Sequence, residues 1–250
     1  MSEPFPSNPK QNRLLAALPD SDYGRLLPDL EPITMPLGWN VFNATIPVGY
    51  VYFPTTSVVS MLYAMENAAP AEISLANNSD LIGISLFMGA ESTLRQCVVH
   101  TAGDAFRVKA QVLKSEFALG SGFQQLALRY AKSKHARLAQ TAACSQKHVA
   151  LQYLSRWLLQ SSDALSSAEL RMTPELITNL LRRERMAQAM ETLERAGMIR
   201  YARGHVTILD RNQLQQYACD CYAAIKSELA AFVRDRNVLA KASRQVGRGV

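Results

Sequence analysis

The chain has 250 residues, of which 48% are hydrophobic and 19% are charged. This length allows one large domain or two ordinary domains with a sizeable core, and the apolar content excludes a disordered or fibrous protein. The 4 cysteines fit a reducing compartment better than a disulfide scaffold. Residues 1–10 lack the apolar run of a secretion signal, so we expect a cytoplasmic protein.

The formal net charge of +6 is divided unevenly along the chain. Residues 1–120 carry 7 basic and 11 acidic side chains, a net charge of −4. Residues 121–250 carry 20 basic and 10 acidic side chains, a net charge of +10. This asymmetry indicates that only the second half binds a polyanion such as nucleic acid, although a basic solvated surface gives the same count.

A membrane span is the first alternative to consider, because residues 32–65 contain no charged side chain. Prolines and glycines interrupt this stretch before an apolar helix of about 18 residues can form. The sequence therefore predicts no membrane partner.

The first half contains short runs rich in β-branched and aromatic residues, separated by turn residues. These runs are Tyr50–Phe53, Val58–Tyr63, Ala71–Leu75, Cys97–Thr101 and Ala105–Val108. Their spacing predicts an all-β barrel or jelly roll within residues 1–120, and the apolar pattern of residues 12–30 predicts a small helical cap before it.

This half carries no recognisable catalytic constellation. His100 is its only histidine, whereas a cupin-type metal enzyme needs two or three histidines and a carboxylate. No phosphate-binding loop, dinucleotide fingerprint or nucleophile–histidine–acid arrangement is present. We expect no enzyme and no cofactor.

Residues 121–160 have apolar side chains at helical spacing with basic residues between them. This length predicts either one long connecting helix, which pairs with its twin in a dimer, or two helices packed on the roll. The small polar run from Ser161 to Ser167 predicts a hinge.

Residues 161–212 follow the order of a winged helix-turn-helix domain. Thr173 is a good N-cap before Pro174, and apolar residues follow at helical spacing. A second helix begins at Arg182–Arg185 and ends at Gly197. Two β-rich runs on either side of Arg203 then predict a hairpin, which forms the wing.

In this order of elements the sequence resembles the Crp/Fnr superfamily of transcription regulators. The resembling runs are Asn12–Pro19, Val51–Pro54, Leu81–Gly89, Met172–Ile177, Ala196–Tyr201 with Arg203–His205, and Ala218–Tyr222. The resemblance implies an α+β protein with a cyclic-nucleotide-binding-like β-roll sensor domain (1–120), a long dimerisation helix (121–160), a C-terminal winged helix-turn-helix DNA-binding domain (161–212), and an amphipathic helix with a basic tail (213–250).

The sequence departs from the members that bind cyclic nucleotides. In those members a Gly-Glu pair meets the ribose and an Arg-Ser pair meets the cyclic phosphate. Here Ile84 follows Gly83, and Ser92–Gln96 contains no Arg-Ser pair. Cyclic AMP is therefore not the expected effector, and the effector stays unknown.

The cysteines give no sign of a metal site. The first cysteine is Cys97, so the N-terminal cluster of the iron–sulfur branch is absent. Cys219 and Cys221 are expected on one helix, where their thiols point about 200° apart. We expect structural cysteines and no metal.

The turn of the helix-turn-helix is two residues shorter than in similar members. The chain passes directly from Leu181 to Arg182, without the glycine that such members place there. Two readings stay open: a tighter turn, or one continuous helix from Pro174 to Ala196 that cannot enter the major groove in the usual way.

If the turn holds, the resemblance assigns roles to individual residues. Arg183 would read guanine through O6 and N7, Glu184 would accept from cytosine N4, and Gln188 would meet a base edge or phosphate. Contacts with the DNA backbone are expected from Thr173, Arg182, Arg185, Arg200, Arg203 and His205.

We therefore expect a homodimeric, DNA-binding transcription regulator that does not respond to cyclic nucleotides. Its expected partners are double-stranded DNA, a second copy of itself and RNA polymerase. The alternative is a regulator-derived protein-interaction module, in which the shortened turn has impaired specific DNA binding.

Overall fold

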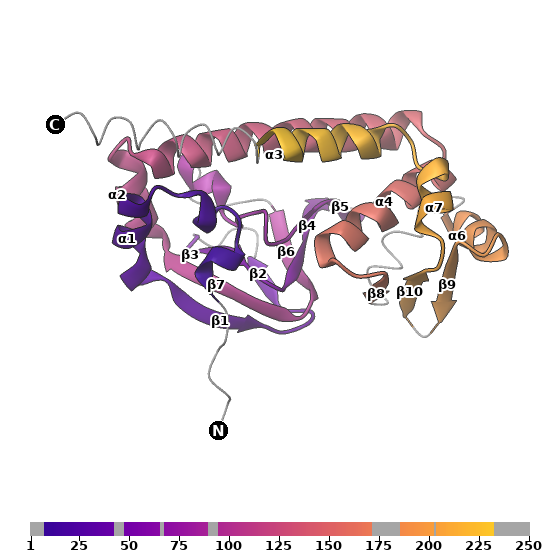
Figure 1. Cartoon of the computed structure of the whole chain (residues 1–250), viewed down its shortest axis with the longest axis horizontal. Helices are drawn as coiled ribbons and strands as arrows, with labels where there is room; N and C mark the ends of the chain where they lie inside the picture. The colour runs from indigo at the N-terminus through magenta and orange to yellow at the C-terminus, as the bar shows by residue number, and fades with distance from the viewer. Residues whose placement is uncertain are drawn as a thin grey trace, which may run out of the picture.

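The structure, a computed structural model, describes residues 8–42, 48–65, 68–89, 95–171, 186–202 and 204–232. The strands of the first half form one group, and the helices and strands within residues 150–217 form another (Figure 1). The long helix α3 (Gly122–Lys147) runs beside both groups. Each group encloses its own hydrophobic core.

The β-roll predicted for the first half is confirmed. One sheet has the strand order β1-β7-β3 and the other the order β2-β6-β4-β5, with antiparallel pairing throughout. The strands are β1 (Glu31–Met35), β2 (Asn40–Phe42), β3 (Tyr50–Pro54), β4 (Val58–Met65), β5 (Ala68–Ala76), β6 (Arg95–Thr101) and β7 (Gly103–Lys109).

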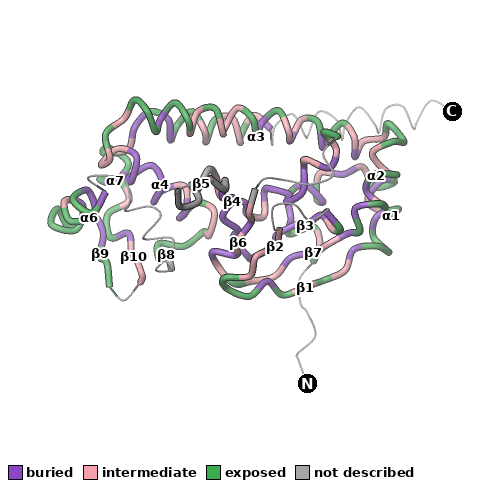
Figure 2. The backbone as a smooth tube through the Cα atoms, turned by 180° about the vertical axis from the view of Figure 1, so that it is seen from behind, coloured by how far each residue is buried: buried purple, intermediate pink, exposed green. Residues whose placement is uncertain are grey.

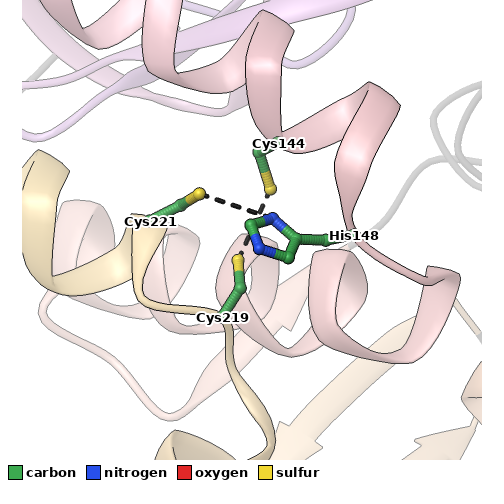
Figure 3. Close-up of side chains that lie close together, drawn as sticks. All are labelled: Cys144, His148, Cys219 and Cys221. Atoms are coloured by element: carbon green, nitrogen blue, oxygen red, sulfur yellow. Dashed lines mark hydrogen bonds between the residues drawn. The ribbon is translucent and has the colours of Figure 1, made fainter.

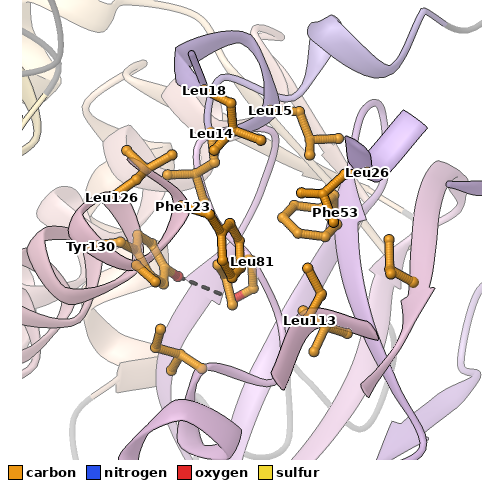
Figure 4. Close-up of a cluster of buried hydrophobic side chains, with 14 of the residues drawn as sticks. Leu14, Leu15, Leu18, Leu26, Phe53, Leu81, Leu113, Phe123, Leu126 and Tyr130 are labelled. Atoms are coloured by element: carbon orange, nitrogen blue, oxygen red, sulfur yellow. Dashed lines mark hydrogen bonds between the residues drawn. The ribbon is translucent and has the colours of Figure 1, made fainter. Parts of the chain in front are cut away.

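Short helices cover one side of the roll and bury its larger core. These are η1 (Pro9–Gln11), η2 (Leu15–Ala17), α1 (Asp20–Leu26), η3 (Leu27–Asp29), η4 (Ile84–Met88) and α2 (Ala110–Ala118). Figure 4 shows Leu26 and Leu113 packed around Phe53, with Phe123 of α3 on the other side. The Phe123 amide donates to the Asp22 carboxylate at 2.8 Å, so α1 supplies the cap for the first turn of α3.

The long helix predicted over residues 121–160 is two helices. α3 ends at Lys147, and α4 (Ala150–Leu165) begins after two residues, His148 and Val149, in extended conformation. All residues from 153 to 159 on α4 are buried, and the apolar ones among them belong to the second core. Burial in the second core therefore favours the break.

The hinge predicted over Ser161–Ser167 is shorter than expected. α4 continues through Ser161 and Ser162, which are buried, and only Ser166 takes a left-handed conformation, with φ 51°. The Ser162 hydroxyl donates to the Ser167 carbonyl at 2.7 Å, which closes the end of the helix.

The hairpin predicted for the wing is present, and it packs on the second hydrophobic core, to which it contributes Ile199, Val206 and Ile208. Strands β8 (Glu169–Arg171), β9 (Ile199–Ala202) and β10 (His205–Ile208) form an antiparallel sheet in the order β8-β10-β9. α6 (Met186–Arg195) precedes β9 and α7 (Arg211–Tyr217) follows β10. Gly197 ends α6 with φ 73°, and the Met198 amide bonds back to Leu193 at 3.0 Å, as in a Schellman cap.

The predicted C-terminal helix is also interrupted. α7 ends at Tyr217, and a second helix over residues 221–232 runs back along α3 (Figure 1). Phe232 reaches Tyr130 of α3, with ring centroids 6.2 Å apart. The chain must turn between these helices, so Cys219 lies in the turn and Cys221 begins the next helix. The expectation that one helix holds both thiols is therefore wrong.

Candidate nucleic-acid interface

The predicted DNA-binding head consists of the recognition helix and the wing, and the structure describes it from Met186 onward, as α6, β9 and β10. We call this part the reading head. α6 buries Met186, Ala189, Met190 and Leu193 against the second core. Gln188 lies on the opposite side of the helix and is exposed. It is therefore free of the core and available to a ligand that approaches α6 from outside.

Most of the predicted DNA contacts lie outside the described residues. These are Thr173, Arg182, Arg183, Glu184, Arg185 and Arg203. The shortened turn after Leu181 falls in the same part of the chain. Both readings of that turn stay open.

The wing places its two described site residues differently. Arg200 on β9 is exposed, as expected of a side chain that meets phosphate. His205 on β10 is half-buried, and its Nδ1 lies 2.9 Å from Oε1 of Glu169 on β8. Contact of this nitrogen with DNA therefore requires the carboxylate to move.

Ile84 stands where similar regulators that bind cyclic nucleotides have a glutamate, whereas residues 92–94 of the predicted phosphate region lie outside the described residues. Gly83 has φ 113°, and a Cβ at this position would lie 3.2 Å from Cγ2 of Val51. The next residue, Ile84, is buried in the core between the roll and its helices. No carboxylate is therefore available at Ile84 to accept a ribose hydroxyl.

The space between the two sheets is filled by side chains. Tyr52 makes edge contacts with Trp39 and Phe42, with ring centroids 5.9 and 5.7 Å away. Met61 and Val99 of the facing sheet complete this cluster. Among the described residues of this cluster none carries a charge that could pair with a cyclic phosphate.

A buried charge network attaches the roll to α3. Oδ1 of Asp80 lies 3.4 Å from Lys134 Nζ and 3.0 Å from Arg137 Nη2, and it accepts from the Tyr130 hydroxyl at 2.9 Å. Burial raises the pKa of Asp80, but the two cations outweigh this and lower it to about 2. Burial lowers the pKa of Lys134 to about 8.

This network borders a cavity of about 570 Å³. The walls come from the end of β5, from α3 and α4, and from the helix over residues 221–232. Arg156 of α4 is 2% exposed there, and within the described part of the chain its Nε and Nη2 have no hydrogen-bond partner. The cavity thus lies at the junction between the two groups of elements.

A β-roll, a long helix and a C-terminal domain with a β-hairpin wing together define the architecture of the Crp/Fnr-type transcription regulators. The protein has this Crp/Fnr-type regulator fold. In sequence, by contrast, no protein-family model and no curated protein matches the chain.

Three solved structures illustrate the similarity. A Crp/Fnr-family regulator from Eubacterium rectale is 14% identical, with 83% of this chain and 98% of that chain covered and a TM-score of 0.65. FixK2 from Bradyrhizobium japonicum is 13% identical, with 76% and 98% covered and a TM-score of 0.65. The c-di-GMP responsive regulator CLP from Xanthomonas campestris is 15% identical, with 75% and 98% covered and a TM-score of 0.61.

No helix in the described ranges is both long and apolar enough to cross a membrane. α3 is the longest, and polar residues recur along its whole length.

Proposed function

We propose that the protein is a DNA-binding transcription regulator that acts as a homodimer. The observation that carries the proposal is that the regulator fold extends over 98% of the length of a Crp/Fnr-family neighbour. The net charge of +10 in the half that contains the wing supports it. A positive surface near a winged head is suited to the phosphate backbone. A cytoplasmic location follows from this task.

The open side of α3 supports a dimer. Tyr130 and Lys134 face the roll and are buried, whereas Leu128, His135 and Ala139 are exposed along the outer side (Figure 2). Two such helices can pack about a two-fold axis. The dimer would then read two half-sites about one helical turn apart.

The effector, if one acts, is not a cyclic nucleotide in this proposal. Ile84 and the filled interior of the roll support this, because Ile84 has no carboxylate for a sugar and the cluster between the sheets has no charged side chain for a phosphate. The cavity beside Arg156 lies where a bound molecule would change the pose of the reading head relative to α3. That change would recruit RNA polymerase or block it.

Selection from a randomised duplex pool tests the proposal. The enriched duplex is then titrated by fluorescence anisotropy at several salt concentrations, with random duplex in parallel. We expect a two-fold motif bound at least about 10³-fold more tightly than random sequence. Binding that depends on salt alone, with no enriched motif, contradicts the proposal and favours the protein-interaction module.

Arg183→Ala tests base reading by the recognition helix. Loss of a bidentate guanine contact is expected to cost about 1–3 kcal/mol and to relax one position of the motif. The measurement is a repeat of the selection and titration with the variant. Lys114→Ala, which removes an exposed cation from α2, is the control and keeps the motif. An unchanged motif for Arg183→Ala shows that Arg183 has no reading role.

Arg200→Gln tests the wing. Each phosphate contact adds about 0.9 to the slope of log affinity against log salt, so a dimer that loses two contacts should show a slope lower by about 1.8. The sequence preference should stay the same. An unchanged slope removes Arg200 from the interface.

A further inference from the structure

Four potential metal ligands from separate segments converge beside the second core (Figure 3). Cys144 lies in the last turn of α3, and His148 lies between α3 and α4. Cys219 and Cys221 come from the turn after α7 and the start of the next helix. Their ligand atoms all lie within 4.8 Å of one another.

The distances fit a single tetrahedral ion. A zinc ion bonded to sulfur at about 2.3 Å and to nitrogen at about 2.0 Å separates two sulfurs by about 3.8 Å, and sulfur from nitrogen by about 3.5 Å. Here the Sγ atoms of Cys144 and Cys219 are 3.4 Å apart, and Sγ of Cys221 is 3.5 Å from Nδ1 of His148. Small side-chain rotations would bring all four atoms onto one centre.

Neighbouring groups support the ligands as they do in metal centres. Nε2 of His148 lies 3.6 Å from the Asp220 carboxylate, so Nδ1 is the ring nitrogen that faces the thiols. The Gln140 amide donates to Sγ of Cys221 at 3.0 Å, a hydrogen bond that stabilises a thiolate. All three cysteines are buried, as in closed structural sites.

We propose that Cys144, His148, Cys219 and Cys221 bind one zinc-class cation. Each thiol loses its proton to solvent as its sulfur bonds the metal. The ion would join the end of α3, the α3–α4 break and the entry to the helix over residues 221–232. It would thus fix the second core, with its wing, relative to α3. The proposed metal site holds whether or not the protein binds DNA.

Two other chemistries use the same thiols less completely. A disulfide between Cys144 and Cys219 would leave Cys221 and His148 without a role, and the cytoplasmic location proposed above disfavours it. An iron–sulfur cluster of four irons bonds each ligand to a different iron and therefore spreads the ligand atoms further apart than one ion does. The experiment below distinguishes the disulfide and the iron–sulfur cluster from a single bound ion.

Metal analysis of the full chain, purified under reducing conditions without chelator, tests the proposal. We expect about one equivalent of zinc per chain, lost on dialysis against a chelator and regained with Zn²⁺. Titration of the stripped chain with Co²⁺ should give the intense visible absorption of a tetrahedral thiolate site. Cys144→Ser and Cys221→Ser should bind no metal, whereas Cys97→Ser, which alters a buried cysteine of the roll, should keep full occupancy.

Asp220→Asn keeps the test decisive if the cysteine variants fail to fold. The Asp220 side chain is 91% exposed, so its loss should not affect folding, yet removal of a partner of the ligating histidine should weaken Co²⁺ affinity about 10-fold or more. The proposal is overturned if the wild-type chain binds no Co²⁺. It is equally overturned by iron with acid-labile sulfide, or by a Cys144–Cys219 disulfide in protein alkylated at lysis.

Discussion

Replacement of Asp80 by Asn is expected to lower the free energy of unfolding by about 3–5 kcal/mol. The Asp80 side chain is 2% exposed, and that of Lys134 is 3% exposed. Without the carboxylate, the ammonium is left buried beside the Arg137 guanidinium, and Glu228 is the acidic neighbour that remains to Arg137. A buried charge that loses its partner costs far more than the intact pair contributes.

The pH dependence of this loss in unfolding free energy tests whether the buried Lys134 ammonium causes it. Burial already lowers the pKa of Lys134 to about 8, and the attraction of Asp80 opposes this. Without Asp80 the pKa of Lys134 falls further, because the ammonium has lost its partner. The deficit of Asp80→Asn should therefore be smaller at alkaline pH, where the amine is neutral in both proteins.

Urea unfolding, followed by circular dichroism and tryptophan fluorescence, measures the effect. The control is Asp20→Asn, because the Asp20 side chain is 90% exposed, and this variant should unfold with the wild type. A loss below about 1 kcal/mol for Asp80→Asn would show that water or other groups solvate Lys134 well enough without the carboxylate.

The roll was predictable because its signals are local. Alternating β-rich runs such as Tyr50–Phe53 and Ala105–Val108, separated by turn residues, identify strands before their partners are known. Gly197 likewise marks the end of α6, because the left-handed conformation there suits glycine. The order of helix, helix and hairpin, which predicts a winged helix-turn-helix, was read from local signals of this kind.

The breaks at His148 and at Cys219 were not predictable from helical spacing. Both segments keep an apolar period across the break, and the chain turns only because the second core needs α4 and the last helix in new directions. This is why the pattern suggested a helix through Cys219 and Cys221 that separates their thiols, whereas the structure brings them together.

The buried charge network around Asp80 and the cluster of three cysteines and His148 each bring together residues that are distant in sequence. Asp80 meets Lys134, which lies 54 residues further along the chain, and Cys144 meets Cys219, which lies 75 residues further. No local period records such pairs. The absence of Glu after Gly83 was different: a single position was enough to predict an apolar region at Ile84, which is buried.

The stability of the wild-type protein should fall as the pH drops from about 6.5 to about 4, partly through His100. Burial lowers the pKa of His100 from 6.5 to about 4. Between these values the unfolded chain binds a proton that the folded chain does not, so stability is present above the unfolded pKa and is lost on acidification. Full protonation costs on the order of 3 kcal/mol.

His100→Gln should remove this part of the pH dependence, because Gln stays neutral over the range. Unfolding free energies of variant and wild type, measured across this pH range, give the difference, and other acidic groups cancel in it. The His100 ring lies 6.5 Å from Trp157 of α4, so its protonation acts where the roll meets the second core. Trp157 fluorescence should therefore change with acid in the wild type before global unfolding and stay constant in His100→Gln. An equal slope in both proteins would show that solvent reaches the imidazole in the folded state.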